Sequence, residues 1–300
     1  MRAVVVKRFG GPEVVEVVDA SLPEPGPGQV RIKVGAAALN PVDAAYGGGF
    51  LVPLQEDGLL GLGWDVAGTV DAAGAGAPFA AGAEVVALAY GPAPAKAQAE
   101  YVVVDSTAVA PAPASVDAAH AATVPLNTLT AAQALDLLDL SPGSTLLVTG
   151  AAGAVGGYAV QLAHRAGITV AGVAGAADEE LVRSFGADRF VERGAAAGPF
   201  DAVLDAAVLG ADALAYVRDD GDYVGVIPQA GPPGVRGIRV QVVEVAADGN
   251  RLAELVKLVD AGVLTPRVAH TYPLEQAADA YRRLAEGGVR GRLVLVPRTG

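Results

Sequence analysis

A glycine-rich segment in the middle of the chain has the residue types and spacing that bind a dinucleotide. Residues 151–156 read Ala-Ala-Gly-Ala-Val-Gly, a G-x-G-x-x-G motif with Ala in first place, between a predicted strand at 145–149 and a predicted helix at 157–165. Without a Cβ, Gly153 lets the backbone approach a pyrophosphate, and Gly156 lets the helix pack close to the strand. The helix N-terminus also attracts phosphate. The alternative is an ordinary glycine-rich turn. The segment predicts cofactor contacts from Ala151, Gly153, Ala154, Val155 and Gly156.

The residues after the second predicted strand bear on which dinucleotide would bind. An NAD-binding unit carries Asp or Glu there, about 20 residues after the motif, for the ribose 2′-hydroxyl. Residues 173–176 contain no acid, and the nearest one, Asp178, begins the next predicted helix. This favours NADPH over NADH. Arg193 is the predicted partner of the 2′-phosphate, with a solvated surface arginine as the alternative. Gly175 and Ile227, at strand ends, complete the predicted cofactor set.

Several other chemistries lack the residues they need. The chain has no cysteine, which excludes disulfides, thiolate metal sites and cysteine nucleophiles. His120, His164 and His270 are far apart, so no metal site is predicted. The chain also lacks the G-x-S-x-G motif of hydrolases and the P-loop motif of phosphoryl-transfer enzymes.

Composition and charge narrow the partners. Hydrophobic residues make up 52% of the 300 residues, enough for a sizeable core, and the net charge is -12. An acidic surface repels phosphate backbones and anionic lipid, so neither nucleic acid nor membrane is an expected partner. The charge-free stretch 118–135 is too polar to span a bilayer, and the N-terminus has too short an apolar run for a signal peptide. We expect a cytoplasmic protein.

Two patterns of secondary structure would position these residues. Val30, Ile32 and Val34 alternate with polar residues, and the first third of the chain has further short strand candidates separated by Gly- and Pro-rich turns. From about residue 115, strands alternate with helices, which predicts a parallel sheet. The last stretch returns to a helix and a strand at 292–296.

The chain resembles the medium-chain dehydrogenase/reductase superfamily, and within it the zinc-free quinone oxidoreductase (zeta-crystallin-like) group. The resemblance rests on segments in the family's order: VRIKVGAAALNPVD (30–43), GLGWDVAGTV (61–70), AATVPLNTLTAAQAL (121–135), LLVTGAAGAVGGYAVQL (146–162) and GRLVL (291–295). It implies an α/β fold, with a GroES-like β-barrel domain (1–117 and 265–300) plus a Rossmann dinucleotide-binding domain (118–264). A homodimer through an edge strand near 238–245 is also implied.

The resemblance also assigns roles to residues. Asn40 and Asp43 match an Asn-x-x-Asp pair that lines the nicotinamide and substrate pocket, and Thr130 matches a threonine near the cofactor. Zinc-dependent relatives carry Gly-His-Glu where this chain has Gly63-Trp64-Asp65, so zinc is not expected. Relatives have a pocket tyrosine two residues after the aspartate; here Ala45 stands there, and Tyr46 is the candidate. By itself, Asn40–Asp43 also fits a turn that caps a helix.

These assignments imply hydride transfer from NADPH to a quinone or to a carbon–carbon double bond beside a carbonyl. Negative charge would develop on the substrate oxygen, and without zinc it must be met by hydrogen-bond donors. Asn40 and Tyr46 are the candidate donors, and Asp43 is expected to orient Asn40 or a ribose hydroxyl. A biosynthetic enoyl reductase and a non-catalytic dinucleotide-binding protein are the alternative functions.

Overall fold

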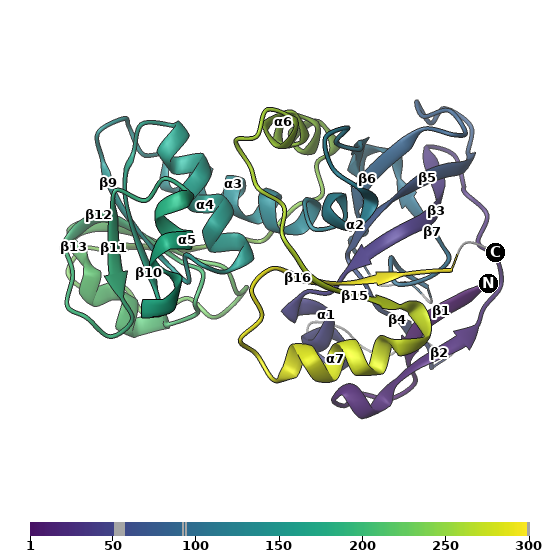
Figure 1. Cartoon of the computed structure of the whole chain (residues 1–300). Helices are drawn as coiled ribbons and strands as arrows, with labels where there is room; N and C mark the ends of the chain where they lie inside the picture. Colours follow the sequence, from purple (N-terminus) through teal and green to yellow (C-terminus); the bar gives the residue numbers. More distant parts are fainter. Residues whose placement is uncertain (51–57, 92, 94, 299–300) are drawn as a thin grey trace. The chain divides into compact units, whose positions relative to one another are not determined.

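A computed structural model describes residues 1–50, 58–91, 93 and 95–298 (Figure 1). The chain divides into two compact units. Unit 1 consists of Met1–Leu126, Ala247–Gly262 and Pro266–Gly300, and unit 2 of Asn127–Ala246 and Val263–Thr265. In the part of the chain that the structure describes, no helix is both long and apolar enough to cross a bilayer.

Unit 1 is built mainly from antiparallel strands. Its larger sheet has the order β15 (Val268–Pro273), β16 (Arg292–Val296), β3 (Gln29–Ala38), β5 (Asp65–Ala73), β6 (Glu84–Leu88) and β8 (Val109–Pro111), with β7 (Tyr101–Asp105) also paired to β3. A smaller sheet has the order β2 (Val15–Asp19), β1 (Arg2–Val6) and β4 (Leu60–Gly61). Its helices are α1 (Pro41–Gly47), α2 (Ala118–Ala121), α6 (Gly249–Asp260) and α7 (Ala277–Ala285).

The predicted alternation in β3 is confirmed. Val30, Ile32 and Val34 are buried in one apolar cluster with valines of β5, β6 and β7. The last described strand, β16, pairs antiparallel with the end of β3, matching Val294 with Ala38 and Leu295 with Ala37. Both ends of the chain therefore contribute to this unit, which is visible in Figure 1 as purple and yellow strands side by side.

Unit 2 contains the predicted parallel sheet. The strand order is β11 (Arg189–Glu192), β10 (Thr169–Ala174), β9 (Thr145–Thr149), β12 (Phe200–Asp205), β13 (Val217–Gly225) and β14 (Arg239–Val242). Numbered within the unit, this is the 3-2-1-4-5-6 order of the doubly wound dinucleotide-binding fold, and every pairing is parallel. Helices α4 (Ala154–Arg165) and α5 (Glu179–Ser184) pack on β9, β10 and β11, and most of α3 (Pro125–Leu138) also belongs to this unit.

One predicted strand end is misplaced. β13 begins at Val217 and ends at Gly225, so Ile227, which was expected at a strand end, lies in the turn beyond it. The start of β13 is not evident from the sequence, because Arg218 and Asp219 are exposed charged residues. Arg218 pairs with Asp201, and Asp219 pairs with Arg236. A charged edge of this kind does not show the apolar pattern on which strand prediction relies.

Helix α6 packs in a different unit from the one expected. The domain limits predicted from sequence grouped it with the parallel sheet, yet it contacts β8 in unit 1. A Cβ on Gly249, its first residue, would lie 2.4 Å from the carbonyl oxygen of Val109, so only glycine allows this approach. At the other end, the Asp260 carboxylate accepts a hydrogen bond from the backbone of Ser115.

Candidate active site

The Asn40–Asp43 segment caps helix α1 directly after β3. The backbone N–H of Asn40 donates to Oδ2 of Asp43 at 2.7 Å, and the backbone N–H of Asp43 donates to the Asn40 carbonyl at 3.0 Å. Pro41 occupies the first helical position, where its missing N–H costs nothing. The capping interpretation is therefore correct, because Asn40 and Asp43 form a capping box at the start of α1. The amide nitrogen of Asn40 donates to a different residue.

That amide is hydrogen-bonded to a buried carboxylate. Nδ2 of Asn40 donates to Oδ2 of Asp65 at 2.7 Å, and the backbone N–H of Leu126 donates to Oδ1 of Asp65 at 2.6 Å. Asn40, Asp43 and Asp65 are all buried. Burial raises the pKa of Asp65 to about 7, and the two hydrogen bonds oppose this increase. Burial also raises the pKa of Asp43, against the opposing effects of the Asn40 backbone and of the charges on Lys96 and Arg292.

A lysine and three aromatic rings lie beside these buried carboxylates. Nζ of Lys96 is 4.7 Å from the ring centre of Tyr46 and 4.6 Å from that of Trp64, within the range of cation–π attraction. Tyr46 and Tyr90 both make edge contacts with Trp64. Burial lowers the pKa of Lys96, whereas the charge of Asp43 raises it. Burial raises the pKa of Tyr46 to about 12, so its hydroxyl remains protonated at neutral pH.

The glycine-rich turn of unit 2 has the predicted strand–turn–helix form. It joins β9 to α4, and Gly153 is the residue that precedes the first turn of α4. A Cβ on Gly156 would lie 2.2 Å from the Gly150 carbonyl oxygen, and such a contact is not tolerated. A Cβ on Gly153 would meet only that same oxygen, at 3.0 Å. Ala151 is buried and its N–H donates to the Val173 carbonyl; Ala154 and Val155 form the first turn of α4.

The other predicted cofactor residues of unit 2 lie after strands at the same edge of the sheet. Gly175 follows β10, and Arg193 follows β11 with its backbone N–H donating to the Ala174 carbonyl at 2.8 Å. Ile227 lies two residues beyond β13. Because the strands are parallel, these positions share the carboxyl edge with the glycine-rich turn. Thr130 lies within α3 and is buried.

An acid lies closer to Gly175 than the sequence indicated. A Cβ on Gly175 would be 3.5 Å from a carboxylate oxygen of Asp178, and Asp178 is itself buried. The short 3-10 turn Ala176–Asp178 brings the side chain back toward the end of β10, whereas a helix starting there would carry it away. Arg193 and Asp178 are thus opposite charges near one strand end.

No sequence pattern marks Lys96 and its neighbours as site residues. The segment Lys96-Ala97-Gln98-Ala99-Glu100 alternates polar and small residues, a pattern that predicts solvent exposure of the polar ones. In the structure both Lys96 and Gln98 are buried, and Gln98 accepts a hydrogen bond from the hydroxyl of Tyr281 at 2.9 Å. Lysine is among the residue types least often buried, so no pattern rule selects it.

The pKa of Asp65 predicts a pH-dependent stability. Its pKa is about 7 in the folded chain against 3.8 as the reference value, so the folded state holds more protons between these values and loses stability as pH rises from about 4 to 7. Asp65→Asn removes this loss. We expect the free energy of unfolding of the variant, relative to wild type, to increase by about 4 kcal/mol across that range.

Urea unfolding at several pH values from 4 to 8 measures this difference. Asp19→Asn is the matched control, because it makes the same substitution at an exposed position on β2. If the difference in the free energy of unfolding between Asp65→Asn and wild type stays constant with pH, the pKa of Asp65 is not raised in solution.

Comparison with known proteins identifies the family. Residues 26–114 match the alcohol dehydrogenase GroES-like domain, and residues 176–295 match the zinc-binding dehydrogenase domain. The chain is 32% identical, over 99% of its own length and 80% of the relative's, to the chloroplastic NADPH-dependent alkenal/one oxidoreductase of Arabidopsis thaliana.

Solved structures agree with this relationship. The quinone oxidoreductase from Coxiella burnetii superposes with a TM-score of 0.88 at 28% identity, covering 99% of both chains. A mycobacterial protein solved in complex with NADPH superposes with a TM-score of 0.84 at 27% identity, covering 99% of this chain and 100% of that one. With its GroES-like and Rossmann parts confirmed, the chain belongs to the quinone oxidoreductase group of the medium-chain dehydrogenase/reductase superfamily.

Proposed function

We propose that this protein is a zinc-independent, NADPH-dependent reductase of quinones or of α,β-unsaturated carbonyl compounds. The observation that carries the proposal is the intact glycine turn at 150–156, in a chain that is similar over nearly its whole length to an NADPH-dependent alkenal/one oxidoreductase. A non-catalytic role would not require the buried polar groups around Asn40 in addition to a dinucleotide site.

The residues of unit 2 fit a dinucleotide. The bare Gly153 backbone and the N-terminus of the twelve-residue helix α4 would hold the pyrophosphate. Gly175, Arg193, Ile227 and Thr130 are the further proposed contacts. When bound, NADPH supplies the hydride. The chain must then bind the substrate, orient it and stabilise the charge that develops on its oxygen.

Asn40 is suited to that last task. Its amide is held in place by the hydrogen bond from Nδ2 to Asp65, and a side-chain amide is a hydrogen-bond donor of the kind that stabilises a developing oxyanion. Asp43 positions Asn40 through the backbone bond and takes no proton in this scheme. The Tyr46 hydroxyl is the second proposed donor. Quinones and enones are already electron-poor, so hydrogen-bond donors suffice where an alcohol dehydrogenase uses a metal.

Two features support the zinc-independent part of the proposal. The chain has no cysteine, and Trp64 and Asp65 stand where zinc-dependent relatives carry His and Glu. Over residues 1–50, 58–91, 93 and 95–298, no three His, Asp or Glu side chains gather in a way that could hold a metal ion. Within the same proposal we include a small-molecule substrate, a cytoplasmic location, and a homodimer formed through the free edge of β14.

Arg193 and Asp178 provide the test of nucleotide choice. Arg193→Ala removes the proposed partner of the 2′-phosphate, so NADPH affinity should fall about tenfold or more while NADH affinity stays unchanged. Arg189→Ala is the matched control, because it removes the same charge at the opposite end of β11. Fluorescence titration with both nucleotides measures the result.

Two other outcomes have a clear meaning. Should NADH bind more tightly than NADPH, and Asp178→Ala abolish that preference, then Asp178 holds a ribose 2′-hydroxyl and the NADPH assignment is wrong. Should neither nucleotide bind, the reductase proposal itself is wrong. Assays of NADPH oxidation with a simple quinone and with a simple enone then distinguish the two substrate classes.

A further inference from the structure

Unit 1 contains two buried groups of opposite charge that each keep an unused polar atom. Among the described residues, Nζ of Lys96 and Oδ1 of Asp43 have no hydrogen-bond partner, although Lys96 is only 2% and Asp43 0% exposed. An ammonium group has three N–H donors, and leaving them unmet in a protein interior is costly. Unsatisfied buried groups of this kind are rare in native proteins and call for a ligand or a catalytic role.

The surroundings keep Lys96 in place without satisfying its donors. The faces of Tyr46 and Trp64 attract the ammonium but accept no conventional hydrogen bond. Tyr90 continues this aromatic wall from Trp64 toward solvent, and its side chain is 63% exposed. The three aromatic rings therefore extend from the protein surface to the buried ammonium group of Lys96.

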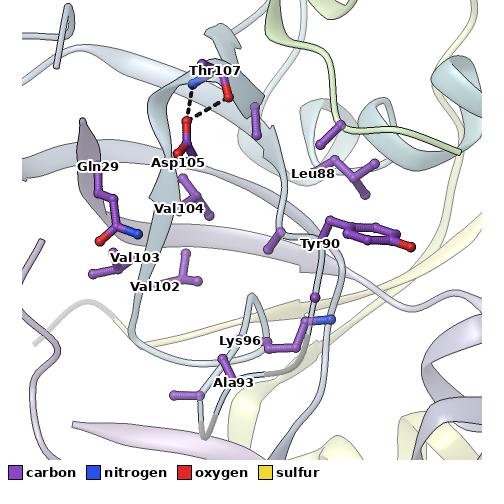
Figure 2. Close-up of a pocket in the computed structure, with 15 residues that line it drawn as sticks. Gln29, Leu88, Tyr90, Ala93, Lys96, Val102, Val103, Val104, Asp105 and Thr107 are labelled. Carbon is purple, nitrogen blue, oxygen red and sulfur yellow. Dashed lines mark hydrogen bonds between the residues drawn. The ribbon is translucent and has the colours of Figure 1, made fainter. Parts of the chain in front are cut away.

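Lys96 also borders a cavity. A pocket of about 340 Å³ lies in unit 1, with Lys96, Tyr90, Leu88 and Val102 among its lining residues (Figure 2). In Figure 2 the amino end of Lys96 turns toward the side on which the Tyr90 ring lies. A planar ring that carries an oxygen suits such a space, since the ring can lie along Tyr90 while the oxygen approaches Nζ.

We propose that Lys96 is a catalytic residue that binds the oxygen of the substrate and donates a proton to it. This inference rests on the proposed function. The substrate oxygen reaches this step as an enolate or a hydroquinone monoanion. One Nζ–H bond breaks and one O–H bond forms, no electrons change hands, and the neutral amine then recovers its proton from water. An enol released in this way becomes the saturated carbonyl compound by tautomerisation in solvent.

Charged and titratable groups from the neighbouring elements set the conditions for this transfer. Asp43 and Tyr46 come from α1, Asp65 from β5, Tyr281 from α7 and Arg292 from β16. Asp43 is the charge that acts on Lys96 directly, while Arg292 acts on Asp43 and Asp65. Burial lowers the pKa of Lys96 toward the range in which an ammonium group gives up a proton readily.

Binding of a phenolate tests the site at Lys96 without any catalytic turnover. A nitrophenol, whose anion absorbs visible light, resembles a hydroquinone monoanion and can be titrated against the protein saturated with NADP⁺. Binding beside Lys96 should lower the apparent pKa of the phenol. Lys96→Met should weaken phenolate binding roughly tenfold to a hundredfold, because one charge-assisted hydrogen bond is lost. Lys7→Met is the matched control, since Lys7 is exposed and paired with Glu16.

Lys96→Arg separates charge from proton donation. Arginine keeps the positive charge but does not release a proton at accessible pH. We expect this variant to retain phenolate affinity, while its kcat falls and its pH profile lacks the alkaline limb expected of wild type. Thermal unfolding of each variant verifies that it is folded.

The inference is overturned if Lys96→Met binds the phenolate as tightly as wild type and keeps its kcat. That result would leave the reductase function standing. Conversely, a wild-type protein that binds phenolate through Lys96 but never oxidises NADPH with any quinone or enone would contradict the proposed function and the proton-transfer step, while retaining an anion site at Lys96.

Discussion

Gly156→Ala is expected to damage both the stability and the nucleotide affinity of the protein. The new methyl group would lie 2.2 Å from the Gly150 carbonyl oxygen and 2.7 Å from its carbonyl carbon. Both are backbone atoms of the turn, so no side-chain rotation relieves the clash and α4 must move away from β9. We expect a loss of about 3 kcal/mol in the free energy of unfolding, with NADPH binding weakened at least about tenfold.

Gly153→Ala separates the two effects. Its methyl group would meet only one atom, at 3.0 Å, so the expected loss of stability is below about 1 kcal/mol. The affinity for NADPH should nevertheless fall, because the methyl group covers the backbone that a pyrophosphate approaches. Urea unfolding and fluorescence titration measure the two quantities. If Gly156→Ala unfolds like wild type and binds NADPH equally well, the close approach of α4 to the turn is not needed.

Asn40→Asp should destabilise the protein by about 3 kcal/mol at pH 8. The substitution replaces the N–H donor facing Asp65 with a carboxylate oxygen, in a buried region that already contains Asp43. Two carboxylates at this distance cannot both ionise and must share a proton, so the penalty should shrink as pH falls toward 5. Urea unfolding at both pH values checks the sign and the size.

The double variant Asn40→Asp/Asp65→Asn is the informative control. It reverses the direction of the hydrogen bond, and an asparagine at 65 still accepts from the Leu126 backbone. Most of the lost stability should therefore return. The reductase activity should not return, because the amide at position 40 is the proposed donor to the substrate oxygen. Recovery of full kcat in the double variant would remove Asn40 from the catalytic scheme.

The parts of the protein that could be predicted from sequence are those in which local pattern and chemistry coincide. Around Gly153, residue periodicity identifies the strand and the helix, and the glycine spacing identifies the turn between them, although α4 begins at Ala154 and not at the predicted 157. The match of Asn40 and Asp43 to a family pair located one corner of the candidate site. Their helix-capping geometry, which spacing also predicted, is present at the same time.

The remainder depends on tertiary packing that no local pattern reports. Burial of Lys96 contradicts the preference of its residue type, and only the aromatic faces of Tyr46 and Trp64 explain its position. Helix α6 has the amphipathic spacing of a helix on any sheet, so its sequence did not reveal that β8 is its partner. Asp178 seemed too distant because the 3-10 turn that returns it toward Gly175 was read as regular helix.

The pairing of β16 with β3 also bears on how the protein is made. During synthesis on a ribosome, β3 emerges well before its neighbour β16. All six strands of the parallel sheet emerge in between, so unit 2 can complete its sheet while the end of β3 at Ala37 and Ala38 still lacks its β16 neighbour. An uncovered strand edge is a template for mispairing with other chains. The nascent chain thus has a period of exposure at the end of β3 that lasts until β16 has emerged, and a need for chaperones is expected in that period.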